Sequence, residues 1–425
     1  MSDSFDILIF QHFCFILGGV ETLYYRMMRW AHSHDIKSIL VIDANATIDI
    51  SWKEKLKVID VELYYIYGIY PYFIIKKEDG TILDLSAYKN VFYISEYFGG
   101  YLKGEYIKRK NNFSNFVNLL YVLTAFDIMQ SKIFFVRYLE NKILLHITKS
   151  NSVVFMDEQI EKTLINAHRE LPEFKHKIIR LGYEIGNEVS EKYLCERYNN
   201  KKRYICAVAR FDFPFKIYIL GLIEVFAKIC KQYPELRLLL IGKGDFIANV
   251  KETINALNKE TAEKITLIEG LPYDELILHM KNAFLNVGMG TTILDFANQS
   301  VPSIISLANE EKDISYGLWS DNWNIIGGFL HDDLASLKPI SECIRDVMGM
   351  SREEYVQLCK RHRLLLVKHY SMEHIMKHLF THRVSTESYI NPFVLHFYSV
   401  FLFIRFKLEK LFPQLLSIFS RYTRR

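Results

Sequence analysis

Short apolar runs alternate with segments of helical periodicity through the second half of the chain. The apolar runs predict strands, and the periodic segments predict helices, because their apolar residues recur every three to four positions. The predicted strands are 204–209, 236–241, 264–268, 284–287 and 301–305, and the predicted helices are 217–231, 245–258, 272–281 and 292–299. Strands separated by helices pair in parallel, so this half predicts an α/β domain.

The first half repeats this pattern less regularly. It opens with a strand-like run at 6–10, a turn at Gly18 and Gly19, and a helical segment at 21–32. The further strand-like runs are 37–42, 56–67, 90–95, 151–155 and 177–181. This half therefore predicts a second α/β unit with a mostly parallel sheet.

Residues 113–146 form a long aromatic stretch within the first half. It contains no unbroken apolar run of the roughly 18 residues that a membrane-spanning helix needs. Its apolar positions instead predict one or two amphipathic helices. Such helices would either belong to the core or present a face to lipid or to a lipid-linked acceptor.

The length of the chain predicts two domains. It has 425 residues, whereas a single core stops growing at roughly 250 to 300 residues. Glycines, asparagines and mixed charges mark 182–202 as the linker. We predict domains at 1–190 and 200–385, with the last helices able to cross back to the first domain, and a tail at 386–425.

Charge and cysteine content exclude two classes of protein. A net charge of +4 is too small for a nucleic-acid binder, which needs a concentrated basic face. The six cysteines are scattered and suit neither a disulfide framework nor a zinc site. The first residues carry Asp3 and Asp6 and lack the basic start of a signal peptide, so a cytoplasmic protein is expected.

The tail has the composition of a membrane-surface segment. Residues 393–404 are an apolar and aromatic run of twelve, too short to span a membrane, and 405–425 carry six bases against the single acid Glu409. Residues 390–425 are therefore predicted to lie in the membrane interface, with Lys and Arg toward anionic headgroups. The alternative is a helix packed on the domain core.

Glycine-rich turns follow several predicted strands, at 18–19, 242–244 and 288–290. Ligands of a parallel sheet bind beyond the carboxyl ends of its strands. A glycine there lets a phosphate approach backbone N–H groups, and the next helix adds its positive end. Such turns are also common as plain structure, so none is decisive alone.

Arg210 and Lys216 lie in one predicted strand-to-helix loop. Two neighbouring cations repel each other, so an anion bound between them explains their placement. The alternative is a pair of solvated loop charges.

These loops carry a resemblance to a known family. The matching segments are A-V-A-R-F-D…K at 207–216, L-L-I-G-K-G-D at 239–245, the turn at 267–271, N-V-G-M-G-T-T-I-L-D…S-V-P at 286–302, and G-G-V-E at 18–21. On these residues the chain resembles the nucleotide-sugar glycosyltransferases of family 4, also called group 1 transferases. The resemblance covers most of residues 5–380 and is stronger in the second half.

The resemblance implies a GT-B fold, in which two Rossmann-like domains face a central cleft. It implies that 1–190 is the acceptor side and that 200–385 binds the nucleotide sugar. Arg210 and Lys216 would then act catalytically by stabilising the leaving diphosphate. The other implied donor-binding residues are Gly18, Gly19, Gly244, Gly288, Met289, Gly290, Thr291, Thr292 and Asp295, with Gly270 and Leu271 near the nucleobase.

Several positions depart from the family pattern. Val287 stands where the family has a Glu that contacts the sugar, and Asp295 stands where it has a Glu for the ribose hydroxyls. The loop from Arg210 to Lys216 is one residue longer than usual, and Ile217 and Ser300 each replace a glycine. We interpret the chain as a diverged member that keeps the phosphate end.

No catalytic nucleophile or base is evident. Glu96 is interpreted as a helix-start carboxylate, with acceptor contact as the alternative, and for His12 a structural role and a functional one stay equally open. The family retains anomeric configuration, and the donor phosphate itself helps to deprotonate the acceptor. No metal or cofactor is predicted, because the chain lacks an Asp-x-Asp pair after a strand, and Asp332-Asp333 is interpreted as helix-start acids.

The predicted function is therefore a retaining, metal-independent glycosyltransferase. It moves a hexose-type sugar from a nucleotide-diphosphate sugar to a lipid-linked or other glycan acceptor, in synthesis of a capsule, O-antigen or lipopolysaccharide at the inner face of the membrane. One alternative is a catalytically silent GT-B protein that acts as a binding partner in an envelope-assembly complex. Another, a nucleotide-sugar 2-epimerase, is disfavoured because it needs acid and base side chains that are not evident.

Overall fold

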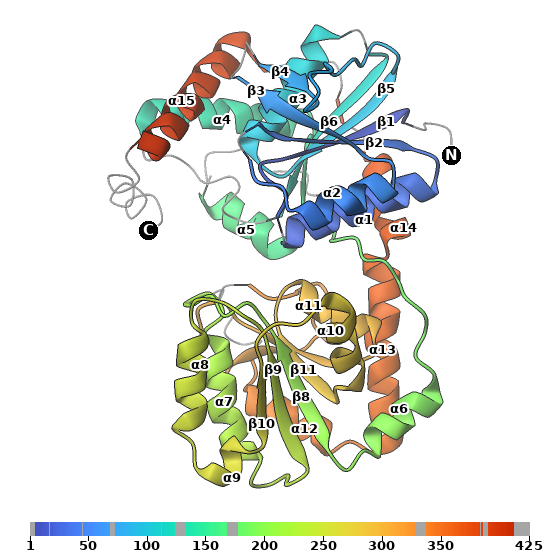
Figure 1. Ribbon diagram of the computed structural model, residues 1–425, viewed down its shortest axis with the longest axis vertical. Helices are drawn as coiled ribbons and strands as arrows, with labels where there is room; N and C mark the ends of the chain where they lie inside the picture. The colour runs from blue at the N-terminus through green and yellow to red at the C-terminus, as the bar shows by residue number, and fades with distance from the viewer. Residues whose placement is uncertain are drawn as a thin grey trace. The chain divides into compact units, whose positions relative to one another are not determined.

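The computed structural model divides the chain into two compact units (Figure 1). Unit 1 contains residues 1–182 and 372–425, and unit 2 contains residues 183–371. The described residues are 5–16, 18–44, 46–68, 73–111, 113–123, 133–167, 177–328, 337–382, 384–385 and 390–411; for 163–167, 273–274, 403 and 405–411 only the backbone is described. Asp332 and Asp333 lie outside this part of the chain.

Unit 1 is built on a seven-stranded sheet in the order β4-β3-β2-β1-β5-β6-β7. All neighbouring strands pair in parallel except β3 and β4. The strands are β1 (Ile7–His12), β2 (Lys37–Asp43), β3 (Glu62–Tyr67), β4 (Ile74–Lys76), β5 (Asn90–Ser95), β6 (Asn115–Val122) and β7 (Val153–Phe155). The helices are α1 (Gly19–Ser33), α2 (Ile50–Val58), α3 (Phe98–Lys110), α4 (Phe134–Lys149), α5 (Glu158–Ala167), α14 (Met372–Phe380) and α15 (Pro392–Leu411).

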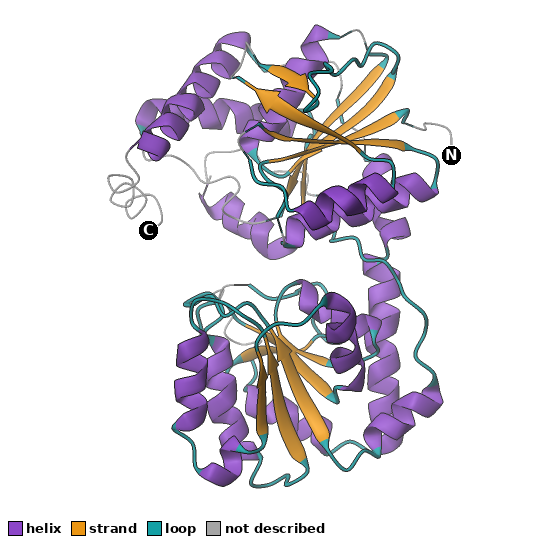
Figure 2. Ribbon diagram, viewed as in Figure 1, coloured by secondary structure: helices purple, strands orange, loops and turns teal. Residues whose placement is uncertain are grey.

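Helices cover both faces of this sheet (Figure 2). Ile7 and Ile9 of β1 lie in a buried cluster with Tyr106 and Ile107 of α3. Phe10, which points to the opposite face, packs against Tyr24 of α1 with ring centroids 5.2 Å apart. A strand buried on both faces reads as a continuous apolar run, which is why β1 shows no alternation in the sequence.

The prediction of amphipathic helices across 113–146 is wrong for its first part. Residues 115–122 form β6, whose side chains are buried from Phe116 onward. A short apolar run in the middle of a parallel sheet has the same hydrophobic signature as a buried helix segment, so periodicity did not distinguish them. The second part is helical, as α4, and residues 124–132 lie outside the described part.

Two other predicted strands of unit 1 are shorter than expected. Of the run 56–67, only residues from Glu62 onward form a strand, because α2 extends to Val58. The run 177–181 makes a single bridge, between Ile178 and Phe155 of β7.

The segment 390–402 packs on unit 1, as the core-helix alternative for the tail requires. Val394, Leu395 and Tyr398 of α15 are buried in a cluster with Val136 and Leu139 of α4. The helix is therefore anchored to the protein on one side. Residues 386–389 and 412–425 of the predicted tail lie outside the described part of the chain.

Unit 2 contains a six-stranded sheet in the order β10-β9-β8-β11-β12-β13, parallel except for the β12–β13 pair. Its strands are β8 (Arg203–Val208), β9 (Leu236–Ile241), β10 (Ile265–Ile268), β11 (Leu285–Gly288), β12 (Ser303–Ser306) and β13 (Ser315–Leu318). Its helices are α6 (Glu191–Tyr198), α7 (Tyr218–Ile229), α8 (Ile247–Asn255), α9 (Lys259–Ala262), α10 (Tyr273–Asn282), α11 (Thr291–Asn298), α12 (Ile340–Met348) and α13 (Arg352–Tyr370).

Two buried clusters sandwich the sheet of unit 2. Ile205 and Ala207 of β8 pack into a cluster with α7, α12 and α13, whereas Cys206 between them packs into a second cluster with α10 and α11. Helices therefore cover both faces here as well (Figure 2). The five predicted strands of this half match β8 to β12 within one or two residues.

The predicted linker 182–202 is not a continuous linker. The chain enters unit 2 at Tyr183, and residues 191–198 form α6, whose Leu194 is buried in the core of unit 2. The chain returns to unit 1 at Met372, so α14 and α15 belong to the first unit. In the part of the chain that the structure describes, no helix combines the length and apolarity needed to cross a membrane.

Candidate functional site

The candidate site of unit 2 lies at the carboxyl edge of its sheet, between β8 and β11. From β8 the chain builds outward to β9 and β10 on one side and then returns to β11 and β12 on the other. Ile205 of β8 pairs with Leu285 of β11, so both strands end at the same level, at Val208 and Gly288. The loops that follow two such strands diverge to opposite faces, and the crevice between them is where α/β sheets bind ligands.

The β8–α7 loop carries both predicted cations. The guanidinium of Arg210 is 74% exposed and lies 3.5 Å from the carboxylate of Asp212. Lys216 is half-buried at the start of α7, with its Nζ 5.2 Å from the ring centroid of Phe215. Among the described residues, no carboxylate lies within 4.0 Å of the Lys216 ammonium.

The electrostatic state of Lys216 reflects this setting. Burial lowers its pKa, and the charge of Arg210 lowers it further, while Asp212 partly opposes both. The resulting pKa is about 8, against an ordinary value of 10.5. A cation in this state is destabilised by its surroundings and would be stabilised by a bound anion.

Two glycines hold the β8–α7 loop in place. A Cβ at Gly242 would overlap the carbonyl oxygen of Ala209, and a Cβ at Gly244 would overlap the backbone of Phe211. Phe211 is buried, and its N–H donates to the carbonyl of Lys243 at 2.9 Å. Gly244, predicted to contact the donor, therefore has a structural role in the close approach of two loops.

The β11–α11 loop contains the other predicted phosphate contacts. Gly290 precedes α11 with φ +77°, a conformation that favours glycine, and no atom lies within 4 Å of an added Cβ. Thr291 and Thr292 begin the helix, half-buried, so their N–H groups lie at its positive end. Met289 is buried and packs against Gly327, so only its backbone could contact a ligand at this site.

Asp295 lies in the second turn of α11 and is 7% exposed. Its carboxylate accepts a hydrogen bond of 2.6 Å from the hydroxyl of Tyr183. A ribose contact at Asp295 therefore stays a prediction, and it would have to coexist with this bond or replace it.

Val287 has a clear structural explanation. Its side chain is fully buried among apolar residues of the sheet and α7, in the larger core cluster of unit 2. An apolar residue suits this position whether or not the protein binds a sugar.

Gly270 follows β10 at the far edge of the sheet. Its φ of +81° again favours glycine, and an added Cβ would lie 3.7 Å from the Cδ of Lys243. Leu271 packs partly buried against the cluster that includes Ile241 and Met280. The predicted nucleobase vicinity is thus separated from β8 by β9.

Gly18 and Gly19 belong to unit 1, where Gly18 caps the start of α1. A Cβ at Gly18 would overlap the carboxylate of Glu21, whereas a Cβ at Gly19 would meet nothing within 4 Å. The loop therefore packs tightly against Glu21 at its first glycine only.

Glu21 belongs to a buried charged cluster at the carboxyl edge of the unit 1 sheet. His12 ends β1, and Glu96 follows β5, the parallel neighbour of β1. The Nδ1 of His12 pairs with the carboxylate of Glu96, and its Nε2 lies 3.4 Å from Glu21. Tyr24 donates a hydrogen bond of 2.9 Å to Glu96.

The two carboxylates keep His12 protonated. Burial by itself lowers the pKa of His12, but the hydrogen bonds and charges of Glu21 and Glu96 outweigh burial and raise the pKa to about 9. At neutral pH the cluster is an imidazolium shared between two carboxylates. Glu96 therefore pairs with His12 and is not only an acid at the start of a helix. His12 has a structural role, since each of its ring nitrogens faces a carboxylate.

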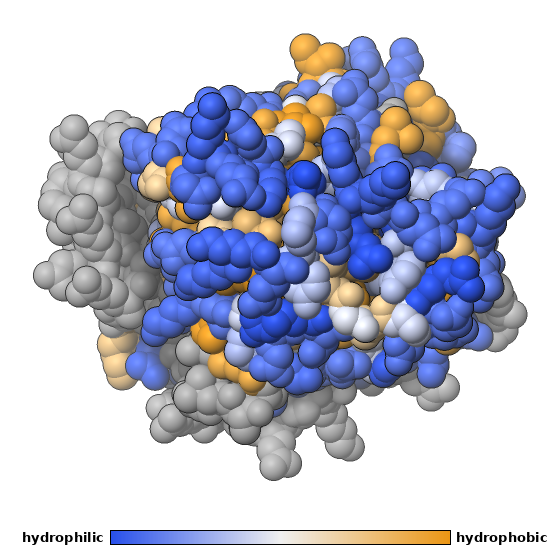
Figure 3. All heavy atoms as spheres, turned by 90° about the horizontal axis from the view of Figure 1, so that it is seen from below, coloured by the Kyte–Doolittle hydropathy of each residue, from blue (hydrophilic) through white to orange (hydrophobic). Residues whose placement is uncertain are grey.

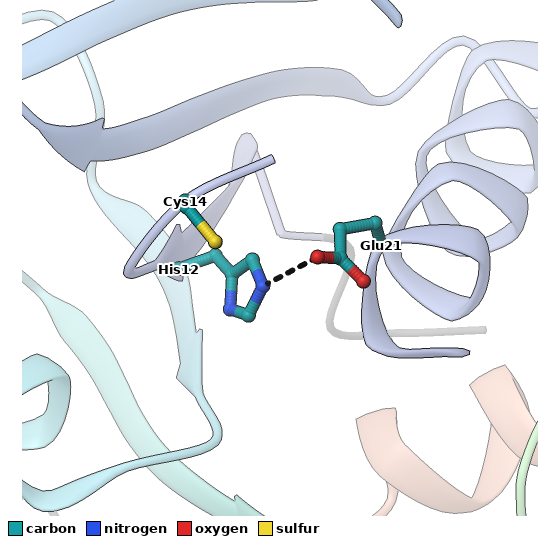
Figure 4. A group of neighbouring side chains, drawn as sticks. All are labelled: His12, Cys14 and Glu21. Atoms are coloured by element: carbon teal, nitrogen blue, oxygen red, sulfur yellow. Dashed lines mark ion pairs between the residues drawn. The ribbon is translucent and has the colours of Figure 1, made fainter. Parts of the chain in front are cut away.

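Cys14 lies beside His12 and Glu21, and Figure 4 shows the His12 ring directed toward Glu21 with the Cys14 sulfur nearby. One potential ligand atom from each of the three residues lies within 4.8 Å of the others, close enough to be considered as a metal site. Both ring nitrogens of His12 already face carboxylates, however, so a metal would have to displace one of these pairs. That the protein requires no metal stays a prediction.

Sequence reasoning named His12 and Glu96 singly and missed that they pair. Their pairing could be predicted only from the order of the strands in the sheet, because β1 and β5 are separated by about 80 residues of chain. Gln11 and Ser95 are aligned in the parallel ladder, which places the next residues, His12 and Glu96, side by side.

No protein-family model and no curated protein matches the sequence. Solved structures do match the fold. A glycosyltransferase from Rickettsia africae has a TM-score of 0.60 and 15% identity, over 88% of this chain and 97% of that one. HepE of Anabaena, solved in complex with UDP and glucose, has a TM-score of 0.56 and 13% identity, over 89% and 98%.

A third match is sucrose-phosphate synthase of Thermosynechococcus elongatus, with a TM-score of 0.54 and 13% identity, over 88% of this chain and 98% of that one. These proteins match nearly their whole lengths, so the likeness includes both units. At such low identity it establishes the fold alone. The predicted fold class is confirmed: this chain has the GT-B fold of nucleotide-sugar glycosyltransferases.

Proposed function

We propose that this protein is a glycosyltransferase whose nucleotide-sugar donor binds at the carboxyl edge of the unit 2 sheet. The donor diphosphate would lie between the β8–α7 loop and the start of α11. Arg210 and Lys216 would contact it from one side, and the N–H groups of Thr291 and Thr292 from the other.

The observation that carries this proposal is the state of Lys216. A half-buried ammonium beside Arg210, with no carboxylate within 4.0 Å among the described residues, is unfavourable without an anion. Lys216 follows β8, at the point where the strand order reverses, and the neighbouring strand β11 leads into the start of α11, which also favours an anion. A doubly charged diphosphate would satisfy both features at once.

The structural neighbours add support from their ligands. HepE of Anabaena was solved with UDP and glucose, a TarM variant of S. aureus with UDP, and an E. coli protein with UDP-2-fluoro glucose. The E. coli protein and TarM have TM-scores of 0.54 and identities of 7% and 9%. A uridine nucleotide is therefore the first donor to test.

Transfer breaks the bond between the anomeric carbon of the sugar and the diphosphate oxygen. A new bond forms between that carbon and an acceptor oxygen, and the acceptor proton passes to the departing diphosphate. Negative charge grows on the diphosphate as the bond breaks, so Arg210 and Lys216 would bind the transition state more tightly than the donor. Retention of configuration is part of the proposal and rests on the family resemblance.

The acceptor and the location are proposed from the sequence. The apolar and basic composition of 390–425 favours peripheral attachment to the inner face of the cell membrane. An acceptor in that membrane would be a lipid-linked glycan, as in capsule, O-antigen or lipopolysaccharide synthesis. The alternative, a catalytically silent GT-B protein that acts as a binding partner in an envelope-assembly complex, rests on Val287, whose buried apolar side chain offers a sugar no hydrogen bond.

Thermal unfolding with and without UDP tests the donor site. Wild type is expected to melt at higher temperature with UDP, since a ligand that binds only the folded state stabilises it. Lys216→Met should lose this shift, because it removes the ammonium and keeps most of the side-chain length. Lys231→Met is the matched control, because Lys231 is exposed just beyond the far end of α7, away from the carboxyl edge.

A full set of nucleotides and nucleotide sugars that leaves the melting temperature of wild type unchanged would refute the donor site. Donor hydrolysis by wild type, absent in Lys216→Met, would show the catalytic step. The configuration at the anomeric carbon of the product, read by NMR, decides between retention and inversion.

A further inference from the structure

Large hydrophobic side chains are exposed together on one part of unit 1. Ile133, Phe134, Phe135 and Tyr138 are exposed at the start of α4, and Phe393 and Phe397 are exposed on α15. Phe134 is 85% exposed and Phe393 is 61% exposed. Single exposed apolar residues scattered over a protein surface are normal. The face of the molecule in Figure 3 is of that ordinary kind, since hydrophilic side chains predominate on it.

The two helices present these side chains as one surface. α15 lies against α4 (Figure 1), anchored by buried Val394, Leu395 and Tyr398. The ring of Phe397 contacts Phe393 at 4.2 Å and Phe135 at 6.3 Å between centroids. The exposed rings are thus held in place by a packed helix pair, and we call this surface the aromatic face.

The exposed charges of α4 are positive. Arg137, Lys142 and Lys149 of α4 are exposed, and the Lys142 ammonium lies 5.4 Å from the ring centroid of Tyr138. Glu140, the one acid of α4, is buried and accepts a hydrogen bond of 3.1 Å from Tyr398. No acid occurs between residues 392 and 404 of α15.

We propose that the aromatic face docks on an anionic lipid bilayer. Phenylalanines on an interfacial helix insert at the boundary between headgroups and acyl chains, and flanking Lys and Arg side chains reach the phosphates. A second copy of the chain fits less well, because a symmetric contact would bring two basic surfaces together, and the described side chains of α4 and α15 offer no exposed carboxylate between them.

The position of the aromatic face suits the proposed function. That the acceptor is a lipid-linked glycan rests on this proposed function. The start of α4 follows β6, and its end leads into β7, so the aromatic face lies toward the carboxyl edge of the unit 1 sheet. That edge is where α/β units bind ligands, and it also holds His12 and Glu96. A bilayer on the aromatic face would therefore place a lipid-linked acceptor near this edge.

Sedimentation with vesicles tests the proposal on the full chain. Wild type is expected to sediment with phosphatidylcholine vesicles that contain phosphatidylglycerol, and less with phosphatidylcholine alone. Phe134→Ser with Phe393→Ser should weaken binding by about tenfold for each ring removed. Ile74→Ser with Ile82→Ser removes two exposed apolar side chains elsewhere in unit 1 and should bind like wild type.

Separate readouts distinguish the possible failures. The UDP-dependent thermal shift should be unchanged in the Phe134 and Phe393 variant, so the donor site and the lipid surface are tested independently. A chain that ends at residue 411 should still bind vesicles, because it keeps every ring of the aromatic face, and loss of binding in this chain would overturn the proposal. Wild-type vesicle binding by the double variant would overturn the proposal. So would a dimer in lipid-free solution that the double variant lacks, which would identify a second copy as the occupant.

Discussion

Replacing Lys216 by Met should stabilise the folded protein while it abolishes donor binding. The pKa of Lys216 falls from 10.5 to about 8 in the folded chain, which corresponds to a cost of at most about 3 kcal/mol for keeping this side chain charged at neutral pH. Methionine carries no charge and has nearly the same length, although it gives up the contact of the ammonium with the Phe215 ring. The substitution should therefore raise the free energy of unfolding by up to about that amount.

The sign of the pH dependence follows from the lowered pKa. Both folded and unfolded chains bind the proton of Lys216 below pH 8, so the full cost is present there. The cost is relieved as the pH rises from 8 to 10.5, because the folded chain releases its proton first. The stability difference between Lys216→Met and wild type should thus shrink over this range.

Differential scanning calorimetry measures both effects. For a unit of this size, about 3 kcal/mol corresponds to a rise in melting temperature of about 6 to 12 °C. Lys231→Met should change the melting temperature little, since an exposed lysine pays no such cost. A Lys216→Met variant that melts below wild type, or that keeps the UDP-dependent shift, would refute the reasoning about this side chain.

Two further predictions test the supporting structure. His12→Gln should lower the free energy of unfolding of unit 1 by about 3 kcal/mol below pH 6.5, because the raised pKa of His12 makes its bound proton stabilising there. This difference from wild type should fade as the pH rises through 9. Urea unfolding at several pH values measures the difference, and a loss of stability that does not depend on pH would contradict the prediction. Gly242→Ala should cost about 1 to 3 kcal/mol and weaken UDP binding, because its Cβ overlaps the Ala209 carbonyl, whereas Gly19→Ala should leave stability nearly unchanged; equal melting temperatures for the two variants would be the contrary result.

Unit 2 was largely predictable from sequence, because strand-like and helix-like segments follow one another regularly along it. Each of its first five strands is bounded by turn residues and followed by a helix or a turn, so local patterns agreed with the fold. β6 was missed because the apolar run that forms it continues in the sequence as far as Phe126, so no turn residue marked the end of a strand. β13 was missed because its partner runs antiparallel at the sheet edge, an arrangement that four residues do not encode.

The sequence was enough to identify the loops of the candidate site, but not the contacts that its residues make with distant parts of the chain. Arg210 and Lys216 could be found from their spacing between two apolar runs, because loop charges stand out against strands. The role of Gly244 depends on a close approach to Phe211, about 30 residues away in sequence, and that approach exists only in the folded sheet. The burial of Asp295 against Tyr183 likewise joins residues more than a hundred positions apart.

The return of the chain to unit 1 at Met372 has a consequence for synthesis. Unit 2 is continuous in sequence, whereas the core of unit 1 is completed only by α15, which buries Val394, Leu395 and Tyr398 against α4. A ribosome therefore releases all of unit 2 before it releases the last helix of unit 1. Until then the apolar side of α4 is uncovered, so the unit that begins first is the last to become complete.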